Sequence, residues 1–261
     1  MDLDADRRAA HILNELGFAV ARSGDEVHGS APIVPEMWVP GTTALRTSLL
    51  ATWVDHVAGV AAIEVLAPRV PVTLELDVHL YERAPAGGTL QAVARVVKAG
   101  RSVVVCEVGL ADGDGHPVGL GTASFMAAPV PGLELPDDIA TRAVEAPSGR
   151  LARPYADRAG CTLREPGVAV LPRTDDNLNA AGTLNGGLIA LVVEEAALSL
   201  TPGATLSSMA LRYLRPVRTG PAVATAEVRA GLGRVEVRDE GDDRAAVAAT
   251  TRVQISDVLV M

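Results

Sequence analysis

The stretch that decides the fold is residues 179–197, which read NAAGTLNGGLIALVVEEAA. Its first part holds Gly182 and the pair Gly186-Gly187, which allow a tight turn and a close approach of the backbone to a ligand. The remainder is apolar on almost every face and predicts a helix buried inside its domain. The exceptions are Glu194 and Glu195, and a carboxylate is costly to bury unless it has a partner or a task.

The start of this predicted helix has a chemical use of its own. Backbone N–H groups near Gly186 and Gly187 have no partner within the helix, so they suit a carbonyl oxygen or an anion. One segment therefore offers an oxyanion-binding end and, two to three turns later, an embedded acid.

The same layout occurs earlier in the chain, at residues 41–59. When Arg46 is aligned with Asn185, Asp55 falls on Glu194. The segments that follow also repeat, and they pair 73–83 with 205–215, 92–97 with 224–229, and 103–105 with 235–237. The chain is thus predicted to be an internal duplication of one structural unit.

Each half is predicted to hold one long helix followed by an antiparallel meander, with short strands before the helix. The helix must lie across the sheet so that both apolar surfaces are buried. In the first half we expect helices at 4–16 and 42–66 and strands at 18–22, 27–33, 72–81, 89–98, 102–111 and 117–127. In the second half we expect a helix at 184–200 and strands at 205–214, 223–230, 234–239 and 245–255.

Three segments describe the predicted domain organisation. Residues 1–130 form the first domain and residues 154–261 the second. Residues 131–153 hold several prolines and mixed charges with little periodicity, which is typical of a connector.

Composition excludes several classes of partner. The net charge is −9 and aromatic residues make up only 3%, which argues against nucleic acid. Two cysteines, Cys106 and Cys161, cannot form a structural zinc site alone, and we expect no metal. No secretory signal is recognised, and no apolar run long enough to span a membrane lacks a charge, so we expect a cytoplasmic protein without a membrane partner.

The motif Asn-x-x-Gly-x-x-x-Gly-Gly at 179–187 opens a buried helix, and Glu194 lies nine residues past Asn185. Together with Tyr-Leu-Arg-Pro at 213–216, it resembles the hotdog-fold acyl-CoA thioesterases, most of all their phenylacetate-pathway branch. The resemblance covers both halves. It implies an α+β protein of two tandem hotdog domains, each with a long central helix wrapped by an antiparallel β-sheet.

In that family, active sites lie where two hotdog units meet. The resemblance implies that the Gly186 N–H, with Gly187 beside it, polarises a thioester carbonyl, and that an acid from the facing unit is general base or nucleophile. Asp55 is that acid in the first predicted site, and Gly187 and Thr73 beside it would bind substrate. Asn179 and Asn185 would position water or substrate there; the family usually carries His in place of Asn185, and an amide cannot shuttle a proton.

A second predicted site joins Glu194, with Ser207, to the loop around Pro40, Arg46 and Thr47. Here Gly-Gly has become Thr47-Ser48. Arg46 offers an alternative, since pairing with Glu194 would make a structural ion pair instead of a catalyst.

The resemblance implies an acyl-CoA thioesterase that releases a free acid and CoA, with no cofactor beyond the CoA of the substrate. Open sheet edges lead us to expect a homo-oligomer. Two alternatives stay open: a non-catalytic acyl-CoA binder and a hotdog hydratase or dehydratase. The latter needs a catalytic histidine in the loop or helix, and neither half has one at an equivalent position. His56 points about 100° away from Asp55 on a helix, so we expect it to be a packed or surface histidine and not a base.

Overall fold

The computed structural model describes residues 11–135, 150–179 and 181–255. Its first half holds the 3-10 helices η1 (Ile12–Leu16) and η2 (Pro35–Met37), the helix α2 (Thr47–Leu66) and strands β1 (Ala19–Ser23), β2 (Glu26–Pro32), β3 (Pro71–Leu80), β4 (Thr89–Ala99), β5 (Val104–Asp112) and β6 (Pro117–Ala127). The second half holds α4 (Tyr155–Ala159), η3 (Asp175–Asn177), α5 (Gly186–Ser199) and strands β7 (Thr162–Glu165), β8 (Val168–Leu171), β9 (Ala204–Tyr213), β10 (Ala222–Arg229), β11 (Leu232–Asp239) and β12 (Arg244–Ile255).

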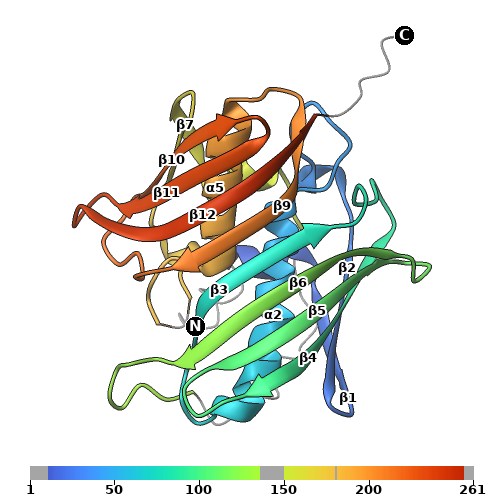
Figure 1. Ribbon diagram of the computed structural model, residues 1–261, viewed down its shortest axis with the longest axis vertical. Coiled ribbons are helices and arrows are strands. Elements are labelled where there is room, and N and C mark those ends of the chain that lie inside the picture. The colour runs from blue at the N-terminus through green and yellow to red at the C-terminus, as the bar shows by residue number, and fades with distance from the viewer. Residues whose placement is uncertain (1–10, 136–149, 180, 256–261) are drawn as a thin grey trace, which may run out of the picture.

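The described strands form one antiparallel sheet in the order β1-β2-β4-β5-β6-β3-β9-β12-β11-β10-β8-β7. The two halves of this order are alike, and β3 and β9 join them at the centre (Figure 1). Helix α2 packs on the first half of the sheet and α5 on the second. This confirms two tandem hotdog units, each a helix wrapped by antiparallel strands.

The central ladder fixes the symmetry between the halves. Glu75 of β3 lies opposite Arg212 of β9, and His79 lies opposite Ser208. The twofold relation therefore matches Glu75 with Ser208 and His79 with Arg212. The sequence alignment of 73–83 with 205–215 is one residue out of register in these strands, because the ladder places Leu206 where the first half has Thr73.

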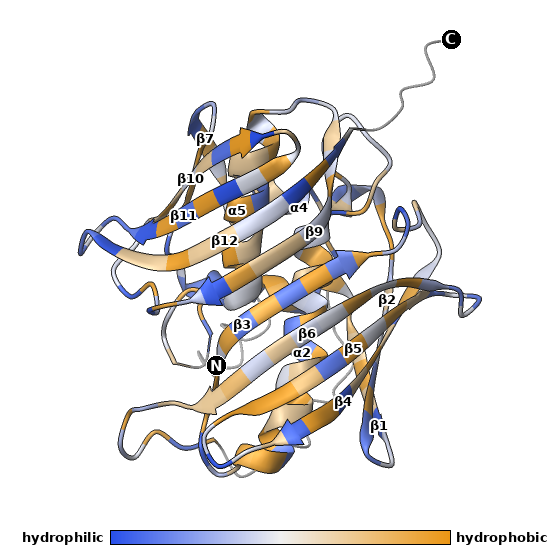
Figure 2. Ribbon diagram, in the orientation of Figure 1, coloured by the Kyte–Doolittle hydropathy of each residue, from blue (hydrophilic) through white to orange (hydrophobic). Residues whose placement is uncertain are grey.

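Side-chain burial follows the expected patterns. Leu76 and Val78 are fully buried on one face of β3, whose residues alternate in hydropathy (Figure 2). Helix α2 is long and apolar enough to span a membrane by length and composition, yet 67% of its most apolar window is buried inside the protein. It is the core helix of its unit.

Both long helices begin later than predicted. Helix α2 starts at Thr47, because Arg46 is extended, with ψ of 132°. Helix α5 starts at Gly186, because Asn185 is extended, with ψ of 138°. In each case the aligned residue is the N-cap, so the duplication extends to the helix starts.

Two sequence predictions fall partly outside the described residues. Of the helix predicted at 4–16, the described part is the 3-10 helix Ile12–Leu16. The connector predicted at 131–153 includes 136–149, which lie outside the described residues. The domain boundaries therefore stay predictions.

Candidate active site

The Asp55 site, as we call it, lies where the middle of α2 meets the start of α5. A Cβ added to Gly186 would lie 3.4 Å from Asp55 Oδ2, so the acid of one half borders the first residue of the other half's helix. Thr73 Oγ1 on β3 donates a hydrogen bond of 2.8 Å to Asp55 Oδ1. The structure thus brings together three of the residues that the sequence assigned to the first site.

The protonation of Asp55 is set by its surroundings. Burial raises the pKa of its carboxyl from 3.8 to about 6, and the hydrogen bond from Thr73 acts in the opposite direction. A carboxylate with a pKa just below neutrality is charged at pH 7 and basic enough to accept a proton from water.

The start of α5 is prepared to receive a negatively polarised oxygen. Asn185 caps the helix, and its Oδ1 accepts a 2.9 Å hydrogen bond from the Gly187 N–H. Across the described part of the chain, no group accepts a hydrogen bond from the Gly186 N–H. This donor therefore stands free beside Asp55, at the partly positive end of the helix.

Gly187 has a packing role as well. A Cβ at this position would lie 2.5 Å from Thr52 Oγ1 of α2. The absence of a side chain lets the two helices approach closely, which in turn holds Gly186 against Asp55. Gly187 was predicted to bind substrate; the structure gives it this packing contact.

Asn179 shapes the turn that leads to α5. Its Oδ1 accepts hydrogen bonds from the N–H groups of Ala181, at 3.0 Å, and Thr183, at 3.1 Å. The side-chain oxygen is thus committed to the loop, and the positioning of water by Asn179 stays a prediction. Asn185 is likewise committed through its Oδ1 to the helix cap.

Tyr213 is a residue of this site to which the sequence analysis gave no role. Its hydroxyl donates a 2.8 Å hydrogen bond to the Gly186 carbonyl, and burial and the charge of Asp55 raise the pKa of the phenol well above 10. Tyr213 therefore ties β9 to the first turn of α5 and stays protonated. The signal was present as the first residue of Tyr-Leu-Arg-Pro.

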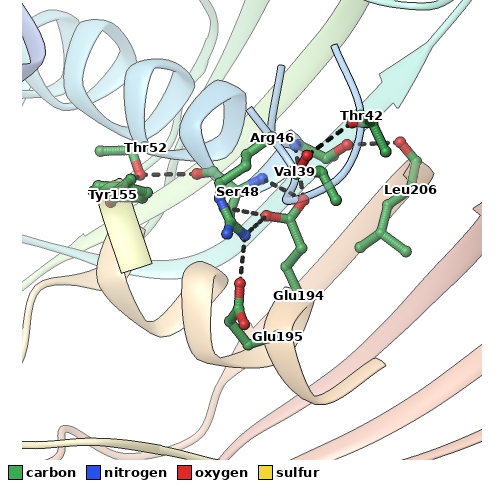
Figure 3. Close-up of polar contacts among 10 residues, drawn as sticks. Val39, Thr42, Arg46, Ser48, Thr52, Tyr155, Glu194, Glu195 and Leu206 are labelled. Carbon is green, nitrogen blue, oxygen red and sulfur yellow. Dashed lines mark hydrogen bonds and ion pairs between the residues drawn. The ribbon is translucent and has the colours of Figure 1, made fainter. Parts of the chain in front are cut away.

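The Glu194 site is the counterpart of the Asp55 site at the other end of the helix pair (Figure 3). Glu194 Oε1 accepts from the N–H groups of Thr47, at 2.8 Å, and Ser48, at 3.3 Å. Its Oε2 accepts from Ser48 Oγ at 2.6 Å and from Arg46 Nη1 at 3.2 Å. The carboxylate thus occupies the Thr47 N–H, whose equivalent at Gly186 stands free at the start of α5, and also the Ser48 N–H, whose equivalent at Gly187 is bonded to Asn185.

Arg46 completes a buried ion-pair cluster. It is 1% exposed and also contacts Glu195 Oε1 at 2.6 Å. Burial alone would lower the pKa of Arg46, but the charges of Glu194 and Glu195 raise it above its ordinary value. Burial raises the pKa of Glu194, opposed by Arg46 and Ser48. This cluster matches the alternative of a structural ion pair.

Ser207 does not join this cluster. Its Oγ contacts the Arg252 carbonyl at 3.4 Å on an exposed part of β9. By the symmetry of the central ladder, the position of Thr73 is taken by Leu206, which has no side-chain donor. The expected pairing of Ser207 with Glu194 is wrong because the duplicated strands differ in register by one residue.

Two further sets of ionisable side chains lie outside both sites, namely His56 and a carboxylate–histidine cluster. His56 lies with its ring edge on Phe18, centroids 5.6 Å apart, and burial lowers the pKa of its imidazole to about 4. It is neutral, as expected of a packing residue. Among described residues, Asp112, Asp114 and His116 could share a metal ion, with ligand atoms within 4.8 Å of one another. They belong to the exposed β5–β6 hairpin and not to the Asp55 site.

Sequence comparisons identify a family for each half. Residues 47–118 match the thioesterase superfamily, and residues 174–253 match the acyl-CoA thioesterase N-terminal domain. These ranges contain both long helices and the residues of both sites except Arg46. Among curated proteins, no sequence match was found.

Solved structures share the fold at low identity. An acyl-ACP thioesterase from Bacteroides thetaiotaomicron is 13% identical, with a TM-score of 0.62 over 88% of this chain and 98% of that one. The 12:0-ACP thioesterase from Umbellularia californica is 13% identical, with a TM-score of 0.63 over 90% and 99%. The tesB protein of Mycobacterium avium subs paratuberculosis is 14% identical, with a TM-score of 0.58 over 93% and 97%.

Proposed function

Since the chain belongs to the thioesterase superfamily and is a thioester hydrolase, we propose that it hydrolyses acyl-CoA thioesters at the Asp55 site. The observation that carries the proposal is the position of Asp55, whose Oδ2 lies 3.4 Å from where a Cβ of Gly186 would be. A base and an unpaired N–H donor then flank the same point at the junction of the two halves.

The reaction follows from these two groups. The thioester carbonyl oxygen accepts a hydrogen bond from the Gly186 N–H, which makes the carbonyl carbon electrophilic. Asp55 takes a proton from water as the water oxygen bonds to that carbon, and the N–H stabilises the oxyanion that forms. When the C–S bond breaks, the proton passes from Asp55 to the thiolate, and free acid and CoA leave.

Thr73 and Tyr213 support this chemistry as positioning residues. The hydrogen bond from Thr73 fixes the orientation of the Asp55 carboxylate and keeps its pKa from rising further. Tyr213 holds the carbonyl of Gly186, which keeps the first turn of α5, and so its free N–H, in place. In the Glu194 site the backbone N–H groups of Thr47 and Ser48 already donate to the carboxylate, and we assign this site a structural role.

The wider setting is part of the same proposal. We place the protein in the cytoplasm, with acyl-CoA as its partner and no cofactor of its own. We also propose a homo-oligomer, because β1 and β7 are edge strands of the sheet and edge strands favour pairing with another chain.

The test is release of free thiol from acyl-CoA thioesters, with the matching acyl-carrier-protein thioesters as a second arm. Wild type should cleave acyl-CoA, and Asp55→Asn should lower kcat by about a hundred- to ten-thousandfold. Glu194→Gln is the matched control and should retain kcat in its folded fraction. Equal activity of Asp55→Asn and wild type would exclude the Asp55 site, and cleavage of carrier-protein substrates alone would reassign the substrate.

A thioester that binds without cleavage would instead support the non-catalytic binder. Calorimetry with acyl-CoA separates that outcome from a failure to bind. A hydratase would show water addition to an enoyl-CoA with no release of thiol.

A further inference from the structure

One face of α2 is open beyond the Asp55 site. From Thr47 to Ala62 the helix is buried except at Asp55, His56 and Gly59, which are half-buried. Gly59 lies four residues after Asp55, so the two share a face of the helix. Ile63, four residues further, is also half-buried. The open stripe therefore starts at the proposed catalytic acid and runs toward the end of α2.

The start of α5 defines where this stripe becomes open. The two helices run antiparallel, since Glu194 contacts Ser48 whereas Gly187 packs on Thr52. Helix α5 begins at Gly186, opposite Asp55. Gly59 therefore lies beyond the end of α5, about 6 Å along α2 from Asp55 at 1.5 Å per residue.

Neither backbone geometry nor packing explains a glycine at position 59. Its φ is not in the left-handed region, and among the described residues a Cβ there would meet only Phe125 Cε1, at 3.9 Å. By contrast, a Cβ at Gly121 would lie 2.5 Å from Val54 Cγ2, so that glycine is required by packing. A glycine inside a helix weakens it relative to alanine. Within the described part of the chain, Gly59 therefore leaves room for at least a methyl group on the helix face that carries Asp55.

The other half fills the equivalent space. Leu198 lies four residues after Glu194, as Gly59 lies four residues after Asp55. Leu198 is half-buried and packs against the core. At this position the helix thus carries a large apolar side chain, Leu198, next to the Glu194 site and no side chain, Gly59, next to the Asp55 site.

We propose that Gly59 is the specificity-determining residue that admits long acyl chains, and that an aliphatic chain lies along α2 over Gly59 toward Ile63. This rests on the proposed hydrolysis at Asp55. Phe125 lies next to this position, since its Cε1 would be 3.9 Å from a Cβ at Gly59. It is opposite Thr73 in the β3–β6 ladder and is 3% exposed, so it belongs to the apolar core beneath the path. The acyl carbonyl sits at Gly186, so a short chain ends before Gly59 and a long one crosses it.

The experiment compares kcat/KM for acetyl-, hexanoyl- and decanoyl-CoA in wild type, Gly59→Ala and Gly59→Leu. Gly59→Leu copies Leu198 and should lower kcat/KM for decanoyl-CoA about tenfold or more, with little change for acetyl-CoA. Gly59→Ala should give a smaller change in the same direction. Gly109→Leu is the matched control, because Gly109 is exposed on β5 with nothing within 4 Å of an added Cβ.

Each outcome bears on one claim. If wild type cleaves thioesters but both Gly59 variants keep its chain-length profile, the role of Gly59 is excluded and the proposed function stands. If wild type cleaves none, the proposed function fails and this inference with it. Circular dichroism and thermal melting check folding. Should Gly59→Leu not fold, Gly59→Ala, which adds only a methyl group, decides: a lower ratio of kcat/KM for decanoyl-CoA to that for acetyl-CoA supports the role of Gly59, and an unchanged ratio excludes it.

Discussion

The Asp55 and Glu194 sites belong to duplicated segments and place an acid in the same position, yet only Glu194 is bound by the start of the helix that it faces. Each acid lies nine residues past an N-cap, Arg46 in one half and Asn185 in the other, and each faces the start of the opposite helix. Asp55 faces a free N–H at Gly186. Glu194 faces Thr47 and Ser48 and accepts hydrogen bonds from their N–H groups.

The N-cap residue and the first turn account for this difference. Arg46 is a buried cation at the start of α2 that pairs with Glu194, and the Glu194 carboxylate also accepts hydrogen bonds from that helix start. Asn185 is neutral and uses its oxygen for its own helix. Under the proposed function, the acid that performs chemistry is thus the one that the facing helix does not neutralise.

The largest expected effect comes from removing the cation. Arg46→Met leaves Glu194 and Glu195 without their positive partner in a buried setting, and breaking a buried pair in this way costs about 3–5 kcal/mol. Urea unfolding should show a lower midpoint, while the folded fraction keeps its thioesterase activity. A loss of stability without a loss of activity would separate the Glu194 site from the Asp55 site.

A surface pair serves as the control for that experiment. Arg95 and Glu107 are 2.7 Å apart across β4 and β5 and are open to solvent, so Arg95→Met should move the midpoint little. If Arg46→Met destabilised no more than Arg95→Met, the Glu194 site would not have the structural role assigned to it.

Sequence reasoning reached the fold because duplication and periodicity are local signals. The equivalence of Arg46 with Asn185, the Asp55–Thr73 pair and the Arg46–Glu194 pair all followed from patterns within one half or from the alignment of the halves, whereas both long helices begin later than predicted. It failed for Ser207, because the alignment of the two central strands was wrong by one residue. The apolar residues of these strands match partly in either alignment, so the sequence pattern did not reveal the error. Tyr213 could be quoted but not placed, since its contact with Gly186 depends on how β9 packs on α5.

Whereas removing Arg46 should destabilise the protein, removing the charge of Asp55 should stabilise it. The folded pKa of Asp55 is about 6 against 3.8, so as pH rises through that window the unfolded chain gives up its proton first and stability falls. At pH 8 Asp55→Asn should therefore be more stable than wild type, by about 1–3 kcal/mol. Chemical unfolding at pH 8 and pH 4 measures this, and the gain should shrink at pH 4. A loss of stability at pH 8 would show that the charge is compensated.

A smaller effect is expected at Tyr213. Tyr213→Phe removes the hydrogen bond to the Gly186 carbonyl and should lower kcat/KM about five- to tenfold, in line with a contribution of about 1 kcal/mol. Tyr81→Phe is the control, because Tyr81 lies just past the corresponding strand of the first half and is 66% exposed. Equal effects of the two variants would remove Tyr213 from the site.

The finest distinction between the two sites is the hydroxyl of Thr73, which Leu206 replaces in the other half. Its hydrogen bond favours the charged form of Asp55, so Thr73→Val should raise the pKa of the base above about 6 and shift the acid limb of log kcat/KM to higher pH. Activity would then fall most below pH 7 and recover at pH 8.5, where Asp55 is ionised in both proteins. Ser207→Ala on β9 should leave the profile in place. Because a loss of packing would lower the rate equally at every pH, only a displaced limb assigns Thr73 to the ionisation of the base, and a limb that moved to lower pH would contradict it.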